Sequence, residues 1–387
     1  MHNKATEVAL KWVLSLRSGT SIMDRTDDGP IPVMGAAGPI GRTSNSNTRP
    51  GSTLIGRVGT VGAINLARED CWASDNVIVA TPGPALESMY TYYLLKSARL
   101  PELASKTAQP LLTASAVAGL RFTVPPLEEQ RRVANFLDVE TARIDALTRT
   151  YVRLRELVSE RSQCVIDSEI GHHQNLTPFR YLTRFREGPG IMAVDFHDEG
   201  IPLIRISGLH RGEVTLNGCN FLDPEKVSRQ WSQFRLKLGD RLISGSATMG
   251  GVSVVKDPAA IGAIPYTGLI ILRPARQDVE MKYVEAFLRS SFFSRQIDVL
   301  KTGATMQHFG PTHLSQIQAP MPSHHEQLRI VENVQAALAH AGRCDDLVNR
   351  QLALLAERRQ SLITAAVSGQ LDVSTASGRN VTDGVTA

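Results

Sequence analysis

The chain has 387 residues, enough for two domains with connecting segments, and it carries 42 Lys and Arg against 38 Asp and Glu. It has no run of about 18 apolar residues, and its first residues lack the apolar core of a signal peptide. We therefore expect a cytoplasmic protein without a membrane span. The four cysteines lie far apart, so we expect reduced thiols in the core or in a helix seam: Cys71, Cys164, Cys219 and Cys344.

Residues 1–124 are predicted to form a domain of short strands and helices. Strands are expected at Ser52–Arg57 and Asn76–Ala80, and a helix at Pro84–Ala98. Gly35–Gly51 is rich in turn-forming residues and poor in apolar ones, so we expect an exposed loop. Candidate binding residues are the polar side chains of this loop and of the glycine-rich turn after it: Arg42, Ser44, Asn45, Asn47, Arg49, Arg57 and Thr60.

A long helix is predicted over residues 125–172. Pro126 suits the first helical position, and Glu128 and Glu129 suit the positive end of the helix dipole. No further Pro or Gly occurs before Gly171, which predicts a rod of roughly 60 Å. Apolar residues recur at spacings of three and four, the pattern of a coiled-coil seam that needs a partner helix: Ile144, Leu147, Tyr151, Leu154, Val158 and Val165.

Residues 173–320 are predicted to form a second mixed domain. Strands are expected at Pro202–Ile206, Asp240–Ser244 and Leu269–Leu272, and a helix at Val279–Ser291. Its arginines suit bidentate phosphate and guanine contacts, and arginine greatly outnumbers lysine in the whole chain. The polar candidates in this domain are Arg205, Ser207, His210, Arg211, Arg229, Gln230, Ser246, Thr248, Lys301, Thr302, Gln307 and His308.

A second long helix is predicted over residues 321–370, followed by a flexible tail at 371–387. Ser323 and Glu326 have the spacing of a capping box, and Ser368–Gly369 is a suitable stop. The second half of the seam is predicted from this helix: Cys344, Val348, Leu355 and Leu362.

The chain repeats itself. The two predicted helices align at a constant offset of 197 positions, which places Gln130 on Gln327 and Gln163 on Gln360. The regions before them align as well, with Lys11-Trp12-Val13 on Arg180-Tyr181-Leu182 and Gly51–Ile55 on Gly239–Ile243. The sequence therefore predicts two copies of one unit, each a mixed domain followed by a long helix.

Motifs for catalysis or cofactor binding are not found. There is no phosphate-binding Gly-x-x-x-x-Gly-Lys loop, no Asn-Pro-Pro-Tyr-like methylation motif and no nuclease carboxylate cluster. Gly56, Gly59 and Gly62 are read as a hairpin turn and not as a dinucleotide fingerprint. The adjacent pairs His172-His173 and His324-His325 have no carboxylate at ligand spacing. We therefore expect no catalytic residue, metal or cofactor.

Four stretches together resemble the specificity subunit of type I restriction–modification systems. They are PPLEEQ at Pro125–Gln130, the related P-x-x-x-E-Q from Pro322, ERRQSLITAAVSGQLDV at Glu357–Val373, and the run GPIGRTSNSNT…GRVGTVGAI…WASDN within Gly38–Asn76. The resemblance covers nearly the whole chain, and the repeat plan is also the family's. The chain departs from the family in its short N-terminus and in Ser323-His324-His325, where the family often has Pro-Leu.

The resemblance implies an α+β fold in which two target-recognition domains are separated by two long antiparallel helices that form an intramolecular coiled coil. Each domain would read half of a bipartite double-stranded DNA target, asymmetric because the loops differ. The helix pair would set the gap and dock two methylase subunits, which the motor and endonuclease subunits join. The subunit itself would be non-catalytic. Helix arginines that could serve docking are Arg131, Arg132, Arg153, Arg155, Arg329, Arg350, Arg358 and Arg359.

Two other functions remain open from the residues alone. A stand-alone nuclease or methyltransferase would need a cofactor loop or a carboxylate cluster. A coiled-coil adaptor would not need two repeated domains with arginine-bearing loops.

Overall fold

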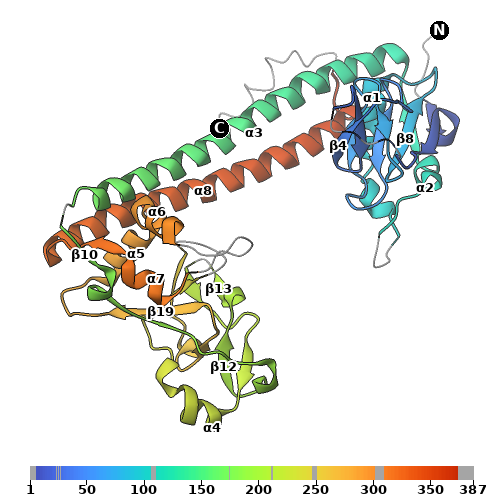
Figure 1. The fold of residues 1–387 in the computed structure, drawn as a ribbon. Coiled ribbons are helices and arrows are strands. Elements are labelled where there is room, and N and C mark those ends of the chain that lie inside the picture. Colours follow the sequence, from blue (N-terminus) through green and yellow to red (C-terminus); the bar gives the residue numbers. More distant parts are fainter. Residues whose placement is uncertain are drawn as a thin grey trace. The chain divides into compact units, whose positions relative to one another are not determined.

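The computed structural model describes residues 6–22, 24, 26, 28–105, 110–173, 175–210, 212–245, 251–300 and 309–373. It has two compact units: unit 1 comprises residues 1–152 and 348–387, and unit 2 comprises residues 153–347. Each unit holds one mixed α/β domain together with parts of the two long helices that Figure 1 labels α3 and α8. The predicted α+β class is confirmed.

Unit 1 is built on two sheets and a strand pair. The four-stranded sheet has the order β2 (Leu14–Ser18), β8 (Val77–Pro82), β5 (Thr53–Gly56) and β6 (Ile64–Leu66). The three-stranded sheet has the order β4 (Gly38–Thr43), β3 (Ile31–Gly35) and β7 (Trp72–Ala73), and β1 (Thr6–Ala9) pairs with β9 (Arg121–Val124). The helices are η1 (Leu10–Trp12), α1 (Ser88–Ser97), η2 (Leu100–Leu103) and α2 (Ala114–Ala118).

Unit 2 repeats this topology with additions. The six-stranded sheet has the order β11 (Thr183–Glu187), β19 (Leu269–Pro274), β16 (Arg241–Ser244), β17 (Val252–Val254), β14 (Glu213–Val214) and β13 (Leu209–His210). The three-stranded sheet has the order β15 (Asn220–Leu222), β12 (Ile201–Ile204) and β18 (Ile264–Pro265), and β10 (Leu176–Pro178) pairs with β20 (Gln318–Pro320). In both units the three-stranded sheet has one antiparallel and one parallel pairing.

The helices of unit 2 follow the same plan. They are η3 (Phe179–Tyr181), η4 (Ala193–Asp195), η5 (Ile206–Gly208), α4 (Pro224–Lys226), a π-helical turn η6 (Val227–Trp231), η7 (Ser232–Phe234), η8 (Pro258–Ala260), α5 (Met281–Arg289), α6 (Ser291–Leu300) and α7 (Pro311–Gln316). The helix α5 is in the position that α1 has in unit 1, since each starts shortly after the central strand β8 or β19.

Two glycines show how closely the repeats correspond. A Cβ on Gly19 would lie 2.1 Å from the carbonyl oxygen of Ser74, and one on Gly188 would lie 2.2 Å from that of Pro265. The N–H of Gly19 donates to Val77 O and that of Gly188 to Leu269 O, each at 2.8 Å. Both copies therefore need glycine for the same close backbone approach.

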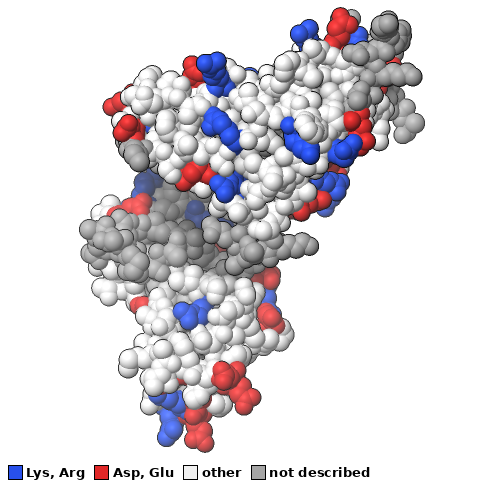
Figure 2. All heavy atoms as spheres, turned by 90° about the vertical axis from the view of Figure 1, so that its right-hand side faces the viewer, with Lys and Arg blue, Asp and Glu red and all other residues white. Residues whose placement is uncertain are grey.

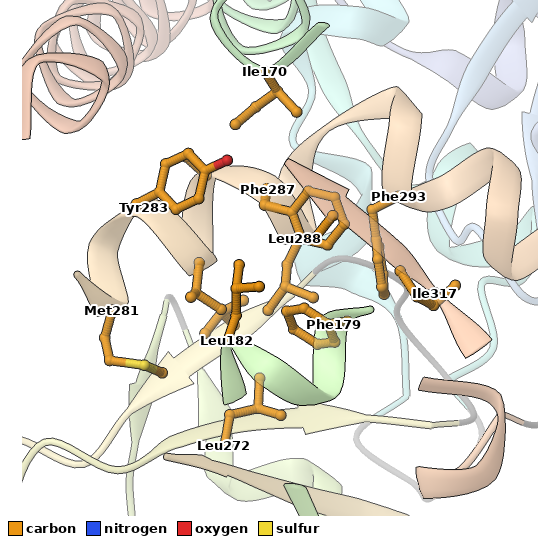
Figure 3. Close-up of a cluster of buried hydrophobic side chains, with 14 of the residues drawn as sticks. Ile170, Phe179, Leu182, Leu272, Met281, Tyr283, Phe287, Leu288, Phe293 and Ile317 are labelled. Carbon is orange, nitrogen blue, oxygen red and sulfur yellow. The ribbon is translucent and has the colours of Figure 1, made fainter. Parts of the chain in front are cut away.

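Each domain packs its own core against the long helices. In unit 2 the core includes Phe179, Tyr283, Phe287 and Phe293, and Ile170 of α3 reaches it from the helix (Figure 3). In unit 1 the equivalent cluster joins Tyr90 and Leu94 of α1 to residues of both long helices, among them Leu137 and Ile363. Burial of these side chains, at about 1.5–3 kcal/mol each, attaches each domain to its helices.

The two long helices agree with the prediction. The helix α3 spans Leu127–Gly171 and α8 spans His324–Val367 (Figure 1). The capping box is confirmed: Glu326 Oε2 accepts from the Ser323 N–H at 2.9 Å and from its hydroxyl at 2.8 Å, and the Glu326 N–H donates to Ser323 Oγ at 3.4 Å.

Within each unit the two long helices run in opposite directions. In unit 1 Arg359 pairs with Asp145, and Ala366 packs in the same cluster as Ala134. In unit 2 Asn333 donates to Glu169 Oε1 at 2.7 Å. In unit 1, an earlier residue of α3 therefore lies near a later residue of α8, as in an antiparallel pair of helices.

The predicted seam residues are buried to different degrees. Ile144 and Val348 are buried, at 5% and 2% exposure. Leu147 and Leu154 are 48% and 42% exposed, against the prediction of buried seam positions, because a two-helix pair covers only one side of each helix. The remaining seam residues are half-buried: Tyr151, Val158, Val165, Cys344, Leu355 and Leu362.

Other predictions hold or need correction. The strands expected at residues 52–57, 76–80, 240–244 and 269–272 are present as β5, β8, β16 and β19. The prediction that Gly35–Gly51 is a loop throughout is wrong, since β4 pairs with β3 across a tight turn at Ala36-Ala37, after which Gly38 starts β4 at φ +136°. All four cysteines are free thiols, but Cys164 is exposed and not a core or seam residue.

Candidate nucleic-acid interface

Many of the candidate residues gather on the three-stranded sheet of each domain and on the segments that follow its strands. In unit 1, Arg42 lies on β4 and Asn47 just after it. In unit 2, Arg205 directly follows β12, and Arg229 lies on the π-helical turn after β15. Two further candidates, Arg57 and Thr60, follow β5 on the hairpin that leads to β6.

Two unit 1 candidates hold the structure together. The Arg42 guanidinium donates from Nε to Gly29 O and from Nη2 to Pro30 O, the latter at 2.7 Å. The Asn47 amide donates to Thr20 Oγ1 and Ala73 O, each at 3.0 Å, and accepts from the Ala73 N–H at 2.7 Å. These bonds orient both side chains on the domain's own backbone. The Arg42 side chain is nevertheless exposed, and the two bonds use two of its five N–H groups.

Arg17 completes this support, and the sequence reasoning missed it. It lies on β2, and its Nη2 donates to Asn47 O and to Thr48 Oγ1, the latter at 3.0 Å. The backbone of Thr48 also pairs with Cys71, and burial raises the pKa of the Cys71 thiol to about 11. No local signal marks Arg17, because its partners lie about 30 residues further along the chain.

The segment between β4 and Asn47 is the exposed tip. Ser44 and Asn45 of this tip are exposed, as is Arg49 after it, and the Asn45 backbone N–H donates to Thr43 Oγ1 at 3.5 Å. On the hairpin, Thr60 is exposed and Arg57 is half-buried. Hydroxyl, amide and guanidinium groups held on an anchored loop are suited to contacts with base edges and phosphates.

In unit 2, Arg205 is exposed but oriented by two neighbours. Its Nη1 donates to Asn220 Oδ1 at 2.9 Å, and its guanidinium lies 5.4 Å from the ring centre of Tyr266. Ser207 donates to Asn217 O at 3.1 Å, and His210 is exposed at the end of β13. The sequence reasoning missed Tyr266. It directly follows β18, the strand that pairs in parallel with β12.

The π-helical turn displays Arg229 and Gln230 side by side in sequence, both exposed. The short helix α4 before this turn is held by Asp223. The Asp223 carboxylate accepts hydrogen bonds from the backbone N–H groups of Lys226 and Glu225, which lowers its pKa. The ammonium group of Lys226 bonds to Asp195 and lowers the pKa of that carboxyl. Single-turn π-helices are frequent at functional sites.

Seven of the predicted residues lie outside the described residues: Arg211, Ser246, Thr248, Lys301, Thr302, Gln307 and His308. Among the residues that the structure describes, no group of three or more His, Cys, Asp and Glu could hold a metal ion. None of the described helices is long and apolar enough to cross a membrane.

Several helix arginines that could serve docking are engaged within their own unit. Arg153 pairs with Glu156 at 3.0 Å and with Glu160 at 3.4 Å, and Arg329 pairs with Glu169 at 3.4 Å. Exposed ones are Arg131, Arg132, Arg350 and Arg358. On the face that Figure 2 shows, Lys and Arg lie interspersed with Asp and Glu.

Comparison with known proteins places this geometry in context. Residues 5–154 match the family described as type I restriction modification DNA specificity domain. The EcoKI specificity subunit of Escherichia coli K12 is 23% identical over 273 residues, which are 65% of this chain and 58% of that protein. The MjaVIII specificity subunit of Methanocaldococcus jannaschii is 20% identical, over 71% of this chain and 69% of that protein.

Solved structures show the same fold. A chain from a study of complex assembly and conformational transition of the type I R-M system has a TM-score of 0.73 at 17% identity, covering 95% of this chain and 99% of that one. The HsdS subunit of Thermoanaerobacter tengcongensis has a TM-score of 0.53 at 17% identity, over 95% and 98% of the two chains. The resemblance that the sequence motifs indicate is confirmed.

Proposed function

We propose that this chain is a specificity subunit of a type I restriction–modification system and that it selects the DNA sequence on which a methylase acts. Each recognition domain reads one half of a bipartite, asymmetric target. The paired long helices set the unread gap and dock two methylase subunits. The chain spans 58% of the length of the EcoKI relative, so this proposal rests on the chain's own features as well.

The observation that carries the proposal is that both domains contain the same three-stranded sheet but differ in the polar side chains at its edges. The three-stranded sheets have the same pairing pattern in both units. The side chains at their edges differ: an asparagine-anchored tip with Ser44 and Asn45 in unit 1, and Arg205 with the π-helical turn in unit 2. Equal frames with different donors and acceptors suit two different half-sites.

The helices support a measuring role. At about 1.5 Å per residue, a helix of 45 residues is about 68 Å long, and major-groove exposures on one face of DNA recur roughly every 34 Å. We propose the boundaries accordingly: recognition domains at 1–124 and 173–320, spacer helices at 125–172 and 321–370, and a tail at 371–387.

Partners and chemistry follow from this role. Double-stranded DNA and two methylase subunits bind the chain directly, and the motor and endonuclease subunits join through the complex. The subunit is non-catalytic, and methyl transfer and cleavage belong to the partners. The protein works in the cytoplasm, where the DNA is.

The test is to co-express the chain with the methylase encoded beside it and to map methylated adenines across the genome. We expect a split motif with two fixed halves and a constant unread gap. Absence of methylation despite a stable complex would contradict the proposal and favour an adaptor role, which DNA binding by the complex would then examine.

A further inference from the structure

Two glutamines 197 positions apart make the same hydrogen bonds at the starts of the two long helices. Gln130 accepts the Glu87 N–H at 2.8 Å and donates from Nε2 to Ala85 O at 2.9 Å and Pro125 O at 2.8 Å. Gln327 accepts the Glu280 N–H at 2.8 Å and donates to Asp278 O at 3.2 Å and Pro322 O at 3.1 Å. Both side chains are fully buried, at 0% exposure.

A primary amide fits these sites better than other side chains. It offers one carbonyl acceptor and two N–H donors, which matches one backbone N–H and two backbone carbonyls. A glutamate would place a carboxylate oxygen against two carbonyls, and an apolar side chain would leave three buried backbone groups unpaired. Each amide thereby ties the residue that caps α1 or α5 to the first turn of a long helix.

A second pair of glutamines forms hydrogen bonds to the C-terminal ends of the same short helices, α1 and α5. Gln360 on α8 donates to Lys96 O near the end of α1 at 3.4 Å. Gln163 on α3 donates to Arg289 O at the end of α5 at 3.0 Å. In each unit, therefore, one short helix is held at its start by one long helix and at its end by the other.

The glutamine contacts are alike in the two domains, and the candidate recognition residues are not. Those residues differ between the two domains, whereas the four glutamines and their partners are the same in kind and in place. A feature that is kept while the reading surfaces diverge serves something that both domains share. What they share under the proposed function is a fixed attachment to the spacer helices.

We propose that Gln130 and Gln327 are positioning residues for gap discrimination, with Gln360 and Gln163 as their supports. This rests on the proposed function. One added base pair moves a half-site by about 3.4 Å and rotates it by roughly 35° about the DNA axis. A domain clamped at both ends of α1 or α5 cannot follow that movement, so targets with the wrong gap lose one half of the contacts. A domain released at the buried glutamine can follow it.

The experiment uses the full chain with its methylase and compares methylation of targets with the native gap and with one base pair added or removed. In Gln327→Met we expect the preference for the native gap to fall about tenfold while the half-site letters stay the same. Gln163→Met should lower it less, since at this half-buried site it loses one bond to the short helix, to Arg289 O, and one within α3, to Asp167 Oδ1. The control is Gln335→Met, at an exposed position of α8, which should leave the preference unchanged.

A second readout separates this inference from the proposed function. Amide hydrogen exchange at Glu280 in the full chain without DNA should be about tenfold faster in Gln327→Met, since its acceptor is gone. If the wild-type complex gives no split motif, the proposed function fails while exchange still reports the clamp. If Gln327→Met assembles with the methylase and keeps the native gap preference, the inference is wrong, whether or not exchange at Glu280 becomes faster. If that variant does not assemble, the gap preference of Gln163→Met decides: an unchanged value overturns the inference.

Discussion

Arg359 of α8 forms a two-point ion pair with Asp145 of α3, from Nη1 to Oδ1 and from Nη2 to Oδ2, each at 2.8 Å. The paired planar groups fix the helices in register as well as in distance. Because the side chains are 33% and 43% exposed, solvent screens the attraction. We expect Asp145→Asn to cost about 0.5 kcal/mol of unfolding free energy, within the range of exposed pairs.

A double-mutant cycle with Arg359→Met measures this pair by urea unfolding. Each single change should cost nearly as much as the double change, because each already removes the same interaction. Strict additivity of the two costs would show that the pair contributes nothing.

The capping box at the start of α8 predicts a pH dependence of stability. Donation from the Ser323 hydroxyl and N–H lowers the pKa of Glu326 below its ordinary value of 4.5. A carboxyl with a depressed folded pKa stabilises the fold above its unfolded pKa and loses that contribution as the pH falls. Ser323→Ala should therefore lower the melting temperature at pH 7 and have less effect near pH 3. Ser361→Ala, exposed on the same helix, is the control and should show no such difference.

The position of Gly188 leaves no room for a larger side chain. An alanine there would bring its Cβ to 2.2 Å from Pro265 O and 2.5 Å from Tyr266 O, both backbone atoms that cannot turn away. We expect Gly188→Ala to cost about 1–3 kcal/mol, as overpacking does. Gly190→Ala is the matched control, since nothing lies within 4 Å of its added Cβ. Equal unfolding free energies for the two variants would contradict the close approach.

Arg42 on β4 and Arg49 in the segment after it should behave differently. Arg42 is bonded to two backbone carbonyls, so Arg42→Ala should lower the melting temperature. Arg49 is exposed and makes no side-chain hydrogen bond among the described residues. In the methylase complex Arg49→Ala should weaken DNA binding and reduce the salt slope by about one, as loss of one phosphate contact does. An unchanged salt slope would place Arg49 away from the DNA.

The spacer role predicts the result of shortening the rod. Removing two heptads from each long helix at opposed positions shortens the pair by about 20 Å and keeps the seam in phase. Methylation mapping should then show a changed gap between unchanged half-sites. A change in the half-site letters would contradict the measuring role of the helices.

The sequence predicted the elements whose signals are local. Pro126 and the Ser323–Glu326 box mark helix starts, and the repeat between Gln130 and Gln327 marks two copies of one unit. The strand β4 was missed because Gly38–Thr43 has few strand-favouring residues and owes its conformation to pairing with β3. Leu147 and Leu154 fit the seam pattern, but spacing alone does not say which stripe of a helix meets its partner.

The sequence does not show which of the candidate binding residues make hydrogen bonds within the domain. Arg42 and Asn47 looked like ligand-binding side chains, yet their partners Gly29 and Ala73 lie 13 and 26 residues away in sequence. Contacts over such distances depend on the folded sheet, so no local pattern could separate supporting residues from displayed ones.

The pairing of β1 with β9 has a consequence for how such a chain can be rebuilt. Thr6 lies opposite Val124 where unit 1's domain begins and ends, and Leu176 lies opposite Pro320 in the same way in unit 2. The entry and exit of each domain are thus neighbours on adjacent strands, about 5 Å apart at Cα. A foreign domain that begins and ends with the same two strands, and that offers the long helices the same packing surface, would therefore connect to them without a change in their length.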